Sequence, residues 1–246
     1  MSRSRKKFAR NHQSSWLYGE HAVRAMLAGD RWRAEEVLVS DGPRLEGVAV
    51  PDGVRVLRES DARIAELVKT DDHQGLAARM PPYPYAAVAD LTRTGGVLIL
   101  DRVQYPMNFG TMVRSAECFG VRDVLIGTTG QCGVTAAVAR MSAGAVFAAT
   151  IARADDLAAA VRELRAGGVR VFAATLDGAG PCDAVDLTGA CGLVIGRESD
   201  GVAPAITAAC DGSVLIPQTG GTQSLNAAAA AAVLLYERSR QERVAS

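Results

Sequence analysis

Three segments of the chain combine polar side chains that can do chemistry with local structure that can bring a ligand close. The first runs from Leu100 to Gly120 and contains Asn108 and Arg114. Asn108 is predicted to cap the helix that follows it, and a helix N-terminus favours phosphate. Taken singly, a plain helix cap for Asn108 and a surface position for Arg114 are the simpler interpretations.

The second segment follows an apolar strand and runs from Ile195 to Val202. Two glycines bracket Arg197, Glu198 and Asp200, and a tight glycine turn lets the backbone approach a ligand closely. The segment lacks the G-x-G-x-x-G spacing, so a dinucleotide site of the Rossmann kind is not indicated.

The third segment, from Ile216 to Tyr236, leads through a glycine loop to Ser224 and Asn226. Six consecutive alanines follow, and a helix with so little bulk can pack closely against other backbone, so we expect it to be buried. A helix cap is a common role for a residue such as Ser224. Asn226 stands in an otherwise apolar segment and is harder to explain by structure alone.

An α/β pattern positions these three segments. Strands are predicted at 97–100, 123–126, 169–173, 192–195 and 214–216, and helices at 109–119, 133–142 and 155–166. Apolar strands that alternate with helices are typical of a parallel sheet. Ligands bind at the carboxyl ends of such strands, where the three polar segments lie.

The upstream part of the chain predicts a smaller α/β module. We expect a basic, disordered tail over 1–15, a compact module over 16–80, a linker over 81–91 that begins with Pro81-Pro-Tyr-Pro84, and the large domain over 92–246. The tail can contact phosphates, and a simple solvated start fits its composition equally well.

Composition limits the possible functions. The 27 basic and 27 acidic residues cancel, which disfavours nucleic-acid binding by bulk charge. Five cysteines form no C-x-x-C pair and the three histidines lie far upstream, so no metal site is expected; Cys118 is predicted to be buried. No apolar run reaches the ~20 residues of a membrane span and no secretory signal is visible, which favours the cytoplasm.

Taken in order, the motifs N-x-G-x-x-x-R-x-A, G-x-E-x-x-G and I-P…S-L-N-A resemble the SpoU (TrmH) class of the SPOUT methyltransferase superfamily over about residues 92–240. Upstream, Tyr18-Gly-Glu-His-Ala-Val23 and His73-Gln-Gly75 look like the L30e-like substrate-binding domain of the 23S rRNA guanosine-2′-O-methyltransferase branch.

The resemblance implies a C-terminal trefoil knot, a homodimer, no metal, and S-adenosylmethionine held largely by backbone groups in the knot. The implied catalytic residues are Asn108, Arg114, Glu198, Ser224 and Asn226. The implied cofactor-binding residues are Thr175, Leu176, Ile195, Gly196, Gly201, Ile216, Ser224, Leu225 and Ala227. The RNA-binding candidates are Arg5, Lys6, Lys7, Arg10, His21, His73, Gln74, Tyr105 and Arg197.

Methylation of a ribose requires that a hydroxyl lose its proton as its oxygen attacks the sulfonium methyl group. Arg114 is often assigned as the base in this family, but a guanidinium is always protonated in proteins. We prefer a role in which Arg114 orients the hydroxyl or a phosphate and stabilises oxyanion charge. The sequence does not decide between this role and that of a base. The chain has Tyr105-Pro106 where the family has Asp-Pro, Arg197 for a small residue and Gln218 for Met, which puts target choice in question.

Four functions are therefore compared. A methyltransferase acting on ribosomal RNA is favoured by the extra N-terminal module, which tRNA ribose methyltransferases of the same class commonly lack. A non-catalytic RNA-binding or ribosome-assembly factor would not need all five polar residues. A small-molecule Rossmann enzyme is disfavoured by the missing phosphate fingerprint.

Overall fold

The computed structural model describes residues 16–245, apart from 43, 93–94, 177–179 and 222–223. The described chain forms two compact units. The first comprises 16–84 together with 134–148, and the second comprises 85–133 and 149–245. The predicted basic tail, with Arg5, Lys6, Lys7 and Arg10, lies outside the described residues.

The first unit is a four-stranded sheet with short helices. Its elements are β1 (Trp16–Tyr18), α2 (Glu20–Ala28), β2 (Glu36–Val39), β3 (Arg55–Arg58), α3 (Asp61–Val68), β4 (Leu76–Arg79), α5 (Ala136–Met141) and a 3₁₀ turn, η2 (Ala145–Phe147). The strand order is β1-β4-β2-β3, with only the β2–β3 pair parallel. Ser60 caps α3, because its hydroxyl accepts the Arg63 N–H at 3.2 Å.

Residues 134–148 are separated in sequence from the rest of the first unit but pack within it. The ring of Phe147 stacks on Trp32 at 5.5 Å, and the Arg140 guanidinium lies 3.8 Å from the centre of the Tyr18 ring and donates to its hydroxyl. A sequence pattern read along the chain gives no sign of this return.

The expected linker over 81–91 is divided between the two units. Pro81 and Tyr83 pack in the first, where Trp32 donates to the Pro81 carbonyl at 2.9 Å and Tyr83 is buried against its ring. The 3₁₀ turn η1 (Val88–Asp90) and the buried Leu91 belong to the core of the second unit. The proline-rich stretch is thus anchored at Pro81 and Tyr83, while Pro82 and Pro84 are exposed.

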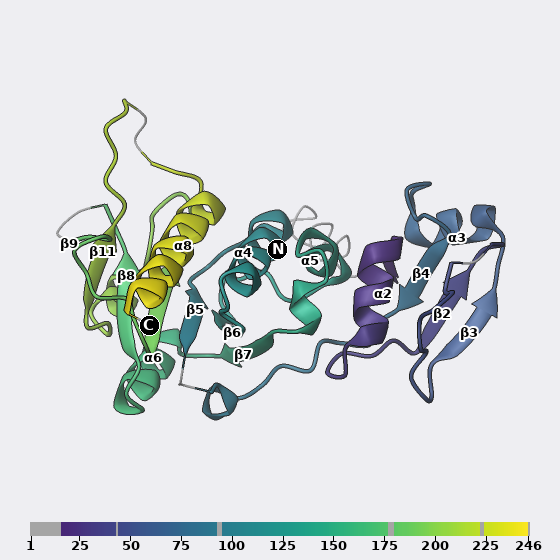
Figure 1. Cartoon of the computed structure of the whole chain (residues 1–246), viewed down its shortest axis with the longest axis horizontal. Helices are drawn as coiled ribbons and strands as arrows, with labels where there is room; N and C mark the ends of the chain where they lie inside the picture. The colour runs from purple at the N-terminus through teal and green to yellow at the C-terminus, as the bar shows by residue number, and fades with distance from the viewer. Residues whose placement is uncertain (1–15, 43, 93–94, 177–179, 222–223, 246) are drawn as a thin grey trace, which may run out of the picture. The chain divides into compact units, whose positions relative to one another are not determined.

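Figure 1 shows the second unit as a sheet covered by helices. Its elements are β5 (Gly96–Leu100), α4 (Pro106–Cys118), β6 (Asp123–Gly127), β7 (Thr150–Ala154), α6 (Leu157–Ala166), β8 (Arg170–Ala174), β9 (Gly180–Pro181), β10 (Cys191–Ile195), α7 (Pro204–Thr207), β11 (Gly212–Leu215) and α8 (Ala227–Ala245). The seven strands are all parallel in the order β7-β6-β5-β10-β8-β11-β9. This confirms the predicted α/β fold with a parallel sheet.

Helices cover both faces of this sheet, which explains the unbroken apolar strands. One face packs Val97, Ile99 and Val194 against α6 and α7. On the other, α4 and α8 lie side by side (Figure 1), and the ring of Phe119 meets Tyr236 edge-on at 5.8 Å. The alanine-rich start of α8 is buried on one face only, because Ala227, Ala228 and Ala231 are buried while Ala229 is exposed.

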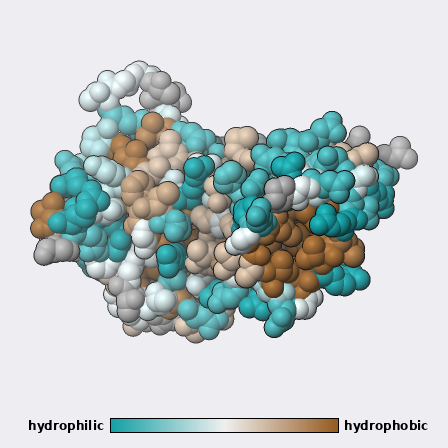
Figure 2. Space-filling model, turned by 45° about the vertical axis from the view of Figure 1, so that its right-hand side comes forward, coloured by the Kyte–Doolittle hydropathy of each residue, from teal (hydrophilic) through white to brown (hydrophobic). Residues whose placement is uncertain are grey.

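Several apolar or weakly polar side chains lie outside the buried core. Cys118 is exposed, so the prediction of a buried thiol is wrong; it follows the last apolar turn of α4. Apolar surface is visible on the first unit (Figure 2), whose large exposed apolar residues among those described are Val56 and Leu57 of β3 and Met141 of α5. No helix in the described part of the chain is long and apolar enough to span a membrane.

Candidate active site

A cavity of about 590 Å³ opens at the carboxyl ends of β8, β10 and β11 in the second unit. Residues 174–176 and 195–202 line it as they leave these strands, together with Val214 and Ile216. The segment that begins α8 closes it with Ser224, Leu225, Ala227, Ala230 and Leu234. The parallel topology gathers segments that are separate in sequence, because their strands end at one edge.

All nine residues implied for cofactor binding line this one cavity. They are Thr175, Leu176, Ile195, Gly196, Gly201, Ile216, Ser224, Leu225 and Ala227. The lining also includes Gln218, one of the three departures from the family pattern. The cavity is thus formed by the residues that the family resemblance selected.

Residues 196–201 make a tight turn, called here the cofactor loop because the family resemblance implies cofactor binding at Gly196 and Gly201. The Gly201 N–H donates to the Arg197 carbonyl at 2.8 Å, and Gly201 has a φ of 63°, which favours glycine. At Gly196, an added Cβ would lie 2.1 Å from the Gly201 carbonyl carbon, so no side chain fits there. Both glycines are therefore required for the two arms of the turn to approach each other.

Four of the five implied catalytic residues lie at or beside the cavity. Glu198 and Ser224 line it, and Asn108 donates from its amide to a Glu198 carboxylate oxygen. Asn226 donates in turn to the Asn108 Oδ1, at 3.5 Å. Asn108, Glu198 and Asn226 come from three different segments, and they form one hydrogen-bonded chain.

The helix caps differ from the sequence predictions. Tyr105 is the N-cap of α4 and Pro106 is its first residue, so Asn108 lies inside the first turn and the prediction of a cap at Asn108 is wrong. At α8 the cap is Asn226, whose Oδ1 accepts the N–H groups of Ala228 and Ala229 at 2.9 and 3.3 Å. Ser224, for which a cap was the simple interpretation, lies before the helix and lines the cavity.

Arg114 lies apart from the other four residues. It is exposed on α4, does not line the cavity, and has no hydrogen-bond or ion-pair partner among the described residues. It lies six positions after Asn108 along the helix, which turns its side chain by roughly 120° from that of Asn108. Arg114 therefore presents its five N–H donors to solvent.

Strong hydrogen bonding keeps the Asp200 carboxylate of the cofactor loop ionised. Arg197, Ser199 and Arg102 donate to the Asp200 carboxylate and hold its pKa well below the ordinary value. Arg102 was not a predicted site residue; its only signal in the sequence is that it is a charged residue just after a buried strand.

Burial raises the pKa of Cys132 to about 11, so this thiol of the β6–α5 connection is protonated near neutral pH.

The RNA-binding candidates of the first unit are placed differently from one another. His21 is exposed on α2. His73 is buried and its Nδ1 accepts the Gly75 N–H at 3.0 Å, while the Gln74 Oε1 accepts the Glu20 N–H at 2.9 Å, at the start of α2. His73 and Gln74 also line a second cavity of about 300 Å³ within this unit.

The two candidates of the second unit are accessible. Tyr105 is 57% exposed before α4, and Arg197 lies in the cofactor loop, partly exposed. Among the residues that the structure describes, no group of three or more His, Cys, Asp or Glu side chains is arranged to hold a metal ion.

Two family models match the chain, one over its N-terminal part and one over most of the rest. Residues 96–236 match the SpoU rRNA Methylase family, and residues 16–86 match the RNA 2′-O ribose methyltransferase substrate-binding domain. The first match covers more than half of the chain. The chain therefore belongs to the SpoU rRNA methylase family.

Individual relatives agree with this family. The chain is 36% identical over 203 residues to an uncharacterized tRNA/rRNA methyltransferase of Mycobacterium sp. (strain KMS), covering 80% of this chain and 65% of the relative. It is 35% identical over 242 residues to the 23S rRNA (guanosine-2′-O-)-methyltransferase RlmB of Xanthomonas axonopodis pv. citri, covering 93% of this chain and 97% of the relative. The chain thus spans less than two thirds of the first relative and nearly all of the second.

A solved structure of an rRNA methyltransferase has a similar fold over nearly the whole chain. The S-adenosylmethionine-bound rRNA methyltransferase of Sinorhizobium meliloti superposes with a TM-score of 0.80 at 27% identity, covering 92% of this chain and 86% of its own.

Proposed function

We propose that the protein transfers a methyl group from S-adenosylmethionine to a ribose 2′-hydroxyl in structured RNA, with 23S ribosomal RNA in the cytoplasm as its substrate. The observation that carries this proposal is the convergence of three separate segments on one cavity in a chain of the SpoU family. Ribosomal RNA is favoured over tRNA by the substrate-binding match and by similarity over nearly the full length of a 23S rRNA methyltransferase.

The cavity fits S-adenosylmethionine in size, shape and charge. Its volume of about 590 Å³ falls in the range of cofactor pockets, and the loop packing at Gly196 leaves backbone groups at the wall. Glu198 supplies negative charge for a ligand with a sulfonium and an ammonium group, whereas Asp200 is already paired with Arg102 and Arg197. When bound, the cofactor supplies an electrophilic methyl group on sulfur.

The polar chain beside the cavity is proposed to hold the reacting groups in line. Asn108 fixes the Glu198 carboxylate, and Asn226 fixes Asn108 from the start of α8. Positioning of this kind can account for much of a rate enhancement, because a ribose hydroxyl must be held at roughly 3 Å from the atom it attacks. Ser224 lies on the cavity wall, two residues before Asn226 in the same segment.

Arg114 is proposed to act on the RNA. An exposed guanidinium with no partner is suited to bind a phosphate or a ribose hydroxyl and to stabilise the charge that develops on the attacking oxygen. It cannot accept the proton, because a guanidinium stays protonated. The proton therefore goes to water or to a phosphate oxygen.

RNA contacts outside the reacting groups are proposed at His21, Tyr105 and Arg197, which are at least partly exposed. The basic residues Arg5, Lys6, Lys7 and Arg10 remain candidates from their charge alone. His73 and Gln74 are proposed to shape the turn beside α2, where they line the smaller cavity.

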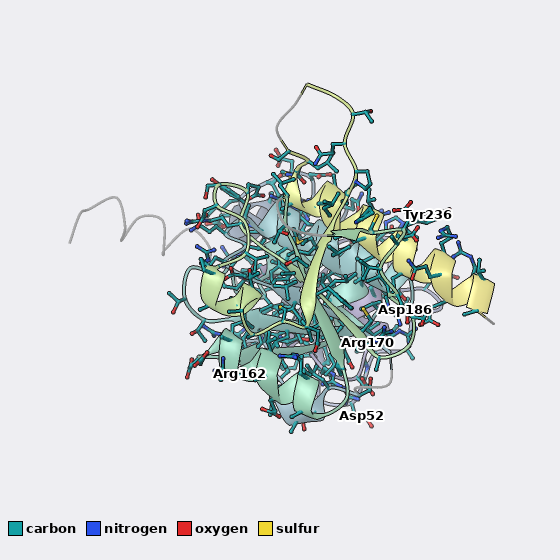
Figure 3. All side chains as sticks on the ribbon, turned by 90° about the vertical axis from the view of Figure 1, so that its left-hand side faces the viewer. Asp52, Arg162, Arg170, Asp186 and Tyr236 are labelled. Carbon is teal, nitrogen blue, oxygen red and sulfur yellow. The ribbon has the colours of Figure 1, made fainter. Side chains whose placement is uncertain are left out.

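We also propose a homodimer built on α4 and α8, with the last segment of the chain threaded as a trefoil knot. Leu234 and Leu235 are buried within the unit, but Met107, Val233 and Tyr236 are 65%, 40% and 49% exposed. Figure 3 shows Tyr236 on the outer side of α8. Apolar side chains gathered on two adjacent helices favour a self-complementary contact. A monomer mass by light scattering at micromolar concentration would contradict the dimer.

The deciding experiment compares 2′-O-methyl sites in ribosomal RNA from cells with and without the gene, beside methylation of rRNA by the purified chain. One 23S nucleotide that loses its methyl group and regains it in vitro supports the proposal. Methylation of tRNA but not rRNA would assign the tRNA function instead. RNA binding without transfer to either RNA would favour an assembly factor.

A further inference from the structure

A charged pair, Asp101 and Arg102, lies behind the cofactor loop, and none of the roles proposed above uses either residue. Asp101 and Arg102 directly follow β5, and Asp101 is buried. Arg102 donates through Nε and Nη2 to the two Asp101 oxygens, both at 3.0 Å. The guanidinium is thereby fixed to the end of a central strand.

The same guanidinium reaches across to the cofactor loop. Its Nη1 donates to Asp200 Oδ2 at 2.6 Å and its Nη2 to the Gly201 carbonyl at 3.0 Å. Arg197 donates to the other Asp200 oxygen at 2.5 Å. Asp101 also accepts the Ala203 N–H at 2.8 Å, so the loop is tied to the end of β5 at its last residues and just after them.

The backbone of Arg102 indicates that its side chain is required. Its φ is 59°, in the left-handed region that glycine adopts readily and other residues disfavour. Glycine would suit this backbone but could make none of the contacts to Asp101, Asp200 or Gly201. An arginine at such a position is best explained by what its guanidinium holds.

We propose that Arg102 is a positioning residue that fixes Asp200 and Gly201 and so keeps the cofactor loop in the shape that lines the cavity. This inference rests on the proposed function, because it assigns the loop's ligand as S-adenosylmethionine. Arg102 touches no reacting group; it acts through the loop, and its loss weakens cofactor binding more than it slows the chemical step.

The test uses Arg102→Gly in the full-length chain, because this change removes the guanidinium and suits the backbone. We expect the dissociation constant for S-adenosylmethionine, measured by calorimetry, to rise about tenfold, the effect of losing hydrogen bonds to a charged group. The KM for the cofactor should rise with it, while kcat falls less than threefold. Arg102→Lys should recover only part of the affinity, since an ammonium cannot bridge Asp101 and Asp200 as a planar fork does.

Two controls separate the loop from general stability. Lys69→Gly replaces another residue with a positive φ, of 62°, in the first unit and should leave cofactor affinity unchanged. In Asp200→Asn the carboxylate partner of Arg102 is already lost. Adding Arg102→Gly to this variant should therefore reduce cofactor affinity by less than Arg102→Gly does in the wild-type chain.

Trypsin cleavage after Arg197 reports on the loop without any cofactor. We expect Arg102→Gly to be cut there several times faster than the wild-type chain, with the fragments identified by mass spectrometry. Equal cleavage and equal cofactor affinity in both proteins would overturn the inference. Faster cleavage in a protein whose wild type binds no S-adenosylmethionine would instead uphold the loop's anchoring and refute the proposed function.

Discussion

The two units handle their predicted functional residues in opposite ways. In the second unit, residues from β8, β10, β11 and the start of α8 converge on one cavity. In the first unit, His21 is exposed while His73 and Gln74 accept backbone N–H groups of their own unit. Similar sequence evidence, a few polar residues in a short motif, thus led to a shared cavity in one case and to a local turn in the other.

Topology explains the difference. Parallel strands place their carboxyl ends at one edge, so polar residues that follow several strands must meet there. The mixed sheet of the first unit has no such rule, because β4 runs antiparallel to both of its neighbours. There, the polar residues nearest a turn are first used to satisfy the turn's own backbone.

The largest expected effect tests whether Arg114 belongs to the active site although it lies away from the cavity. Arg114→Ala should lower the single-turnover methylation rate of an rRNA fragment by on the order of 100-fold or more, the usual loss for one preorganised donor. Cofactor affinity should change little, because Arg114 does not line the cavity. Arg114→Lys should rescue little, since a point charge lacks the planar fork. Equal rates in wild type and Arg114→Ala would mean that Arg114 is a surface residue with no part in the reaction.

The next effect concerns the packing of the cofactor loop. In Gly196→Ala the new methyl group would lie 2.1 Å from the Gly201 carbonyl carbon, so the backbone of the loop must move. We expect cofactor affinity to fall by about tenfold or more. Gly95→Ala is the matched control, because an added Cβ there meets nothing within 4 Å. Similar titrations for the two variants would mean that this loop does not contact the cofactor.

The sequence predicted the second unit well because its strands are buried on both faces. The runs at 97–100, 123–126 and 192–195 lie within β5, β6 and β10, and each of these strands is fully buried. A strand that is buried on both faces is apolar at every position, so it can be recognised from its own sequence without knowing which strands it pairs with. β7 (Thr150–Ala154) was missed, since its partly exposed ends break that run.

Other features could not be predicted because they depend on distant partners. Nothing local indicates that 134–148 packs in the first unit, or that Arg102 meets Asp200. The cap of α8 was placed near Ser224 because serine and asparagine cap helices equally well. Only the hydrogen bonds to Ala228 and Ala229 show that Asn226 is the cap.

A smaller effect separates the two roles of Asn226. Asn226→Ala removes the cap of α8 and should lower stability by about 1 kcal/mol, or roughly 2–4 °C in Tm by calorimetry. Asn226→Asp keeps the acceptor and suits the helix N-terminus, so its Tm should stay near that of the wild type. It loses the amide that donates to Asn108, and its methylation rate should therefore fall. A fully active Asn226→Asp would leave Asn226 with the structural role alone.

The smallest expected effects test the first unit and would reverse the opening comparison if they failed. His21 is exposed, so His21→Ala should weaken RNA binding by about threefold with no change in Tm, as loss of one net hydrogen bond implies. Gln74→Ala removes the acceptor for the Glu20 N–H and should lower Tm by about 2 °C, the size of a lost helix cap in a chain of this length. Its RNA affinity, measured by filter binding below the Tm, should match that of the wild type. The opposite pattern, with RNA binding lost in Gln74→Ala and Tm unchanged, would mean that the turn at 73–75 contacts RNA directly. The first unit would then gather its functional residues beside the smaller cavity, and the contrast with the second unit would disappear.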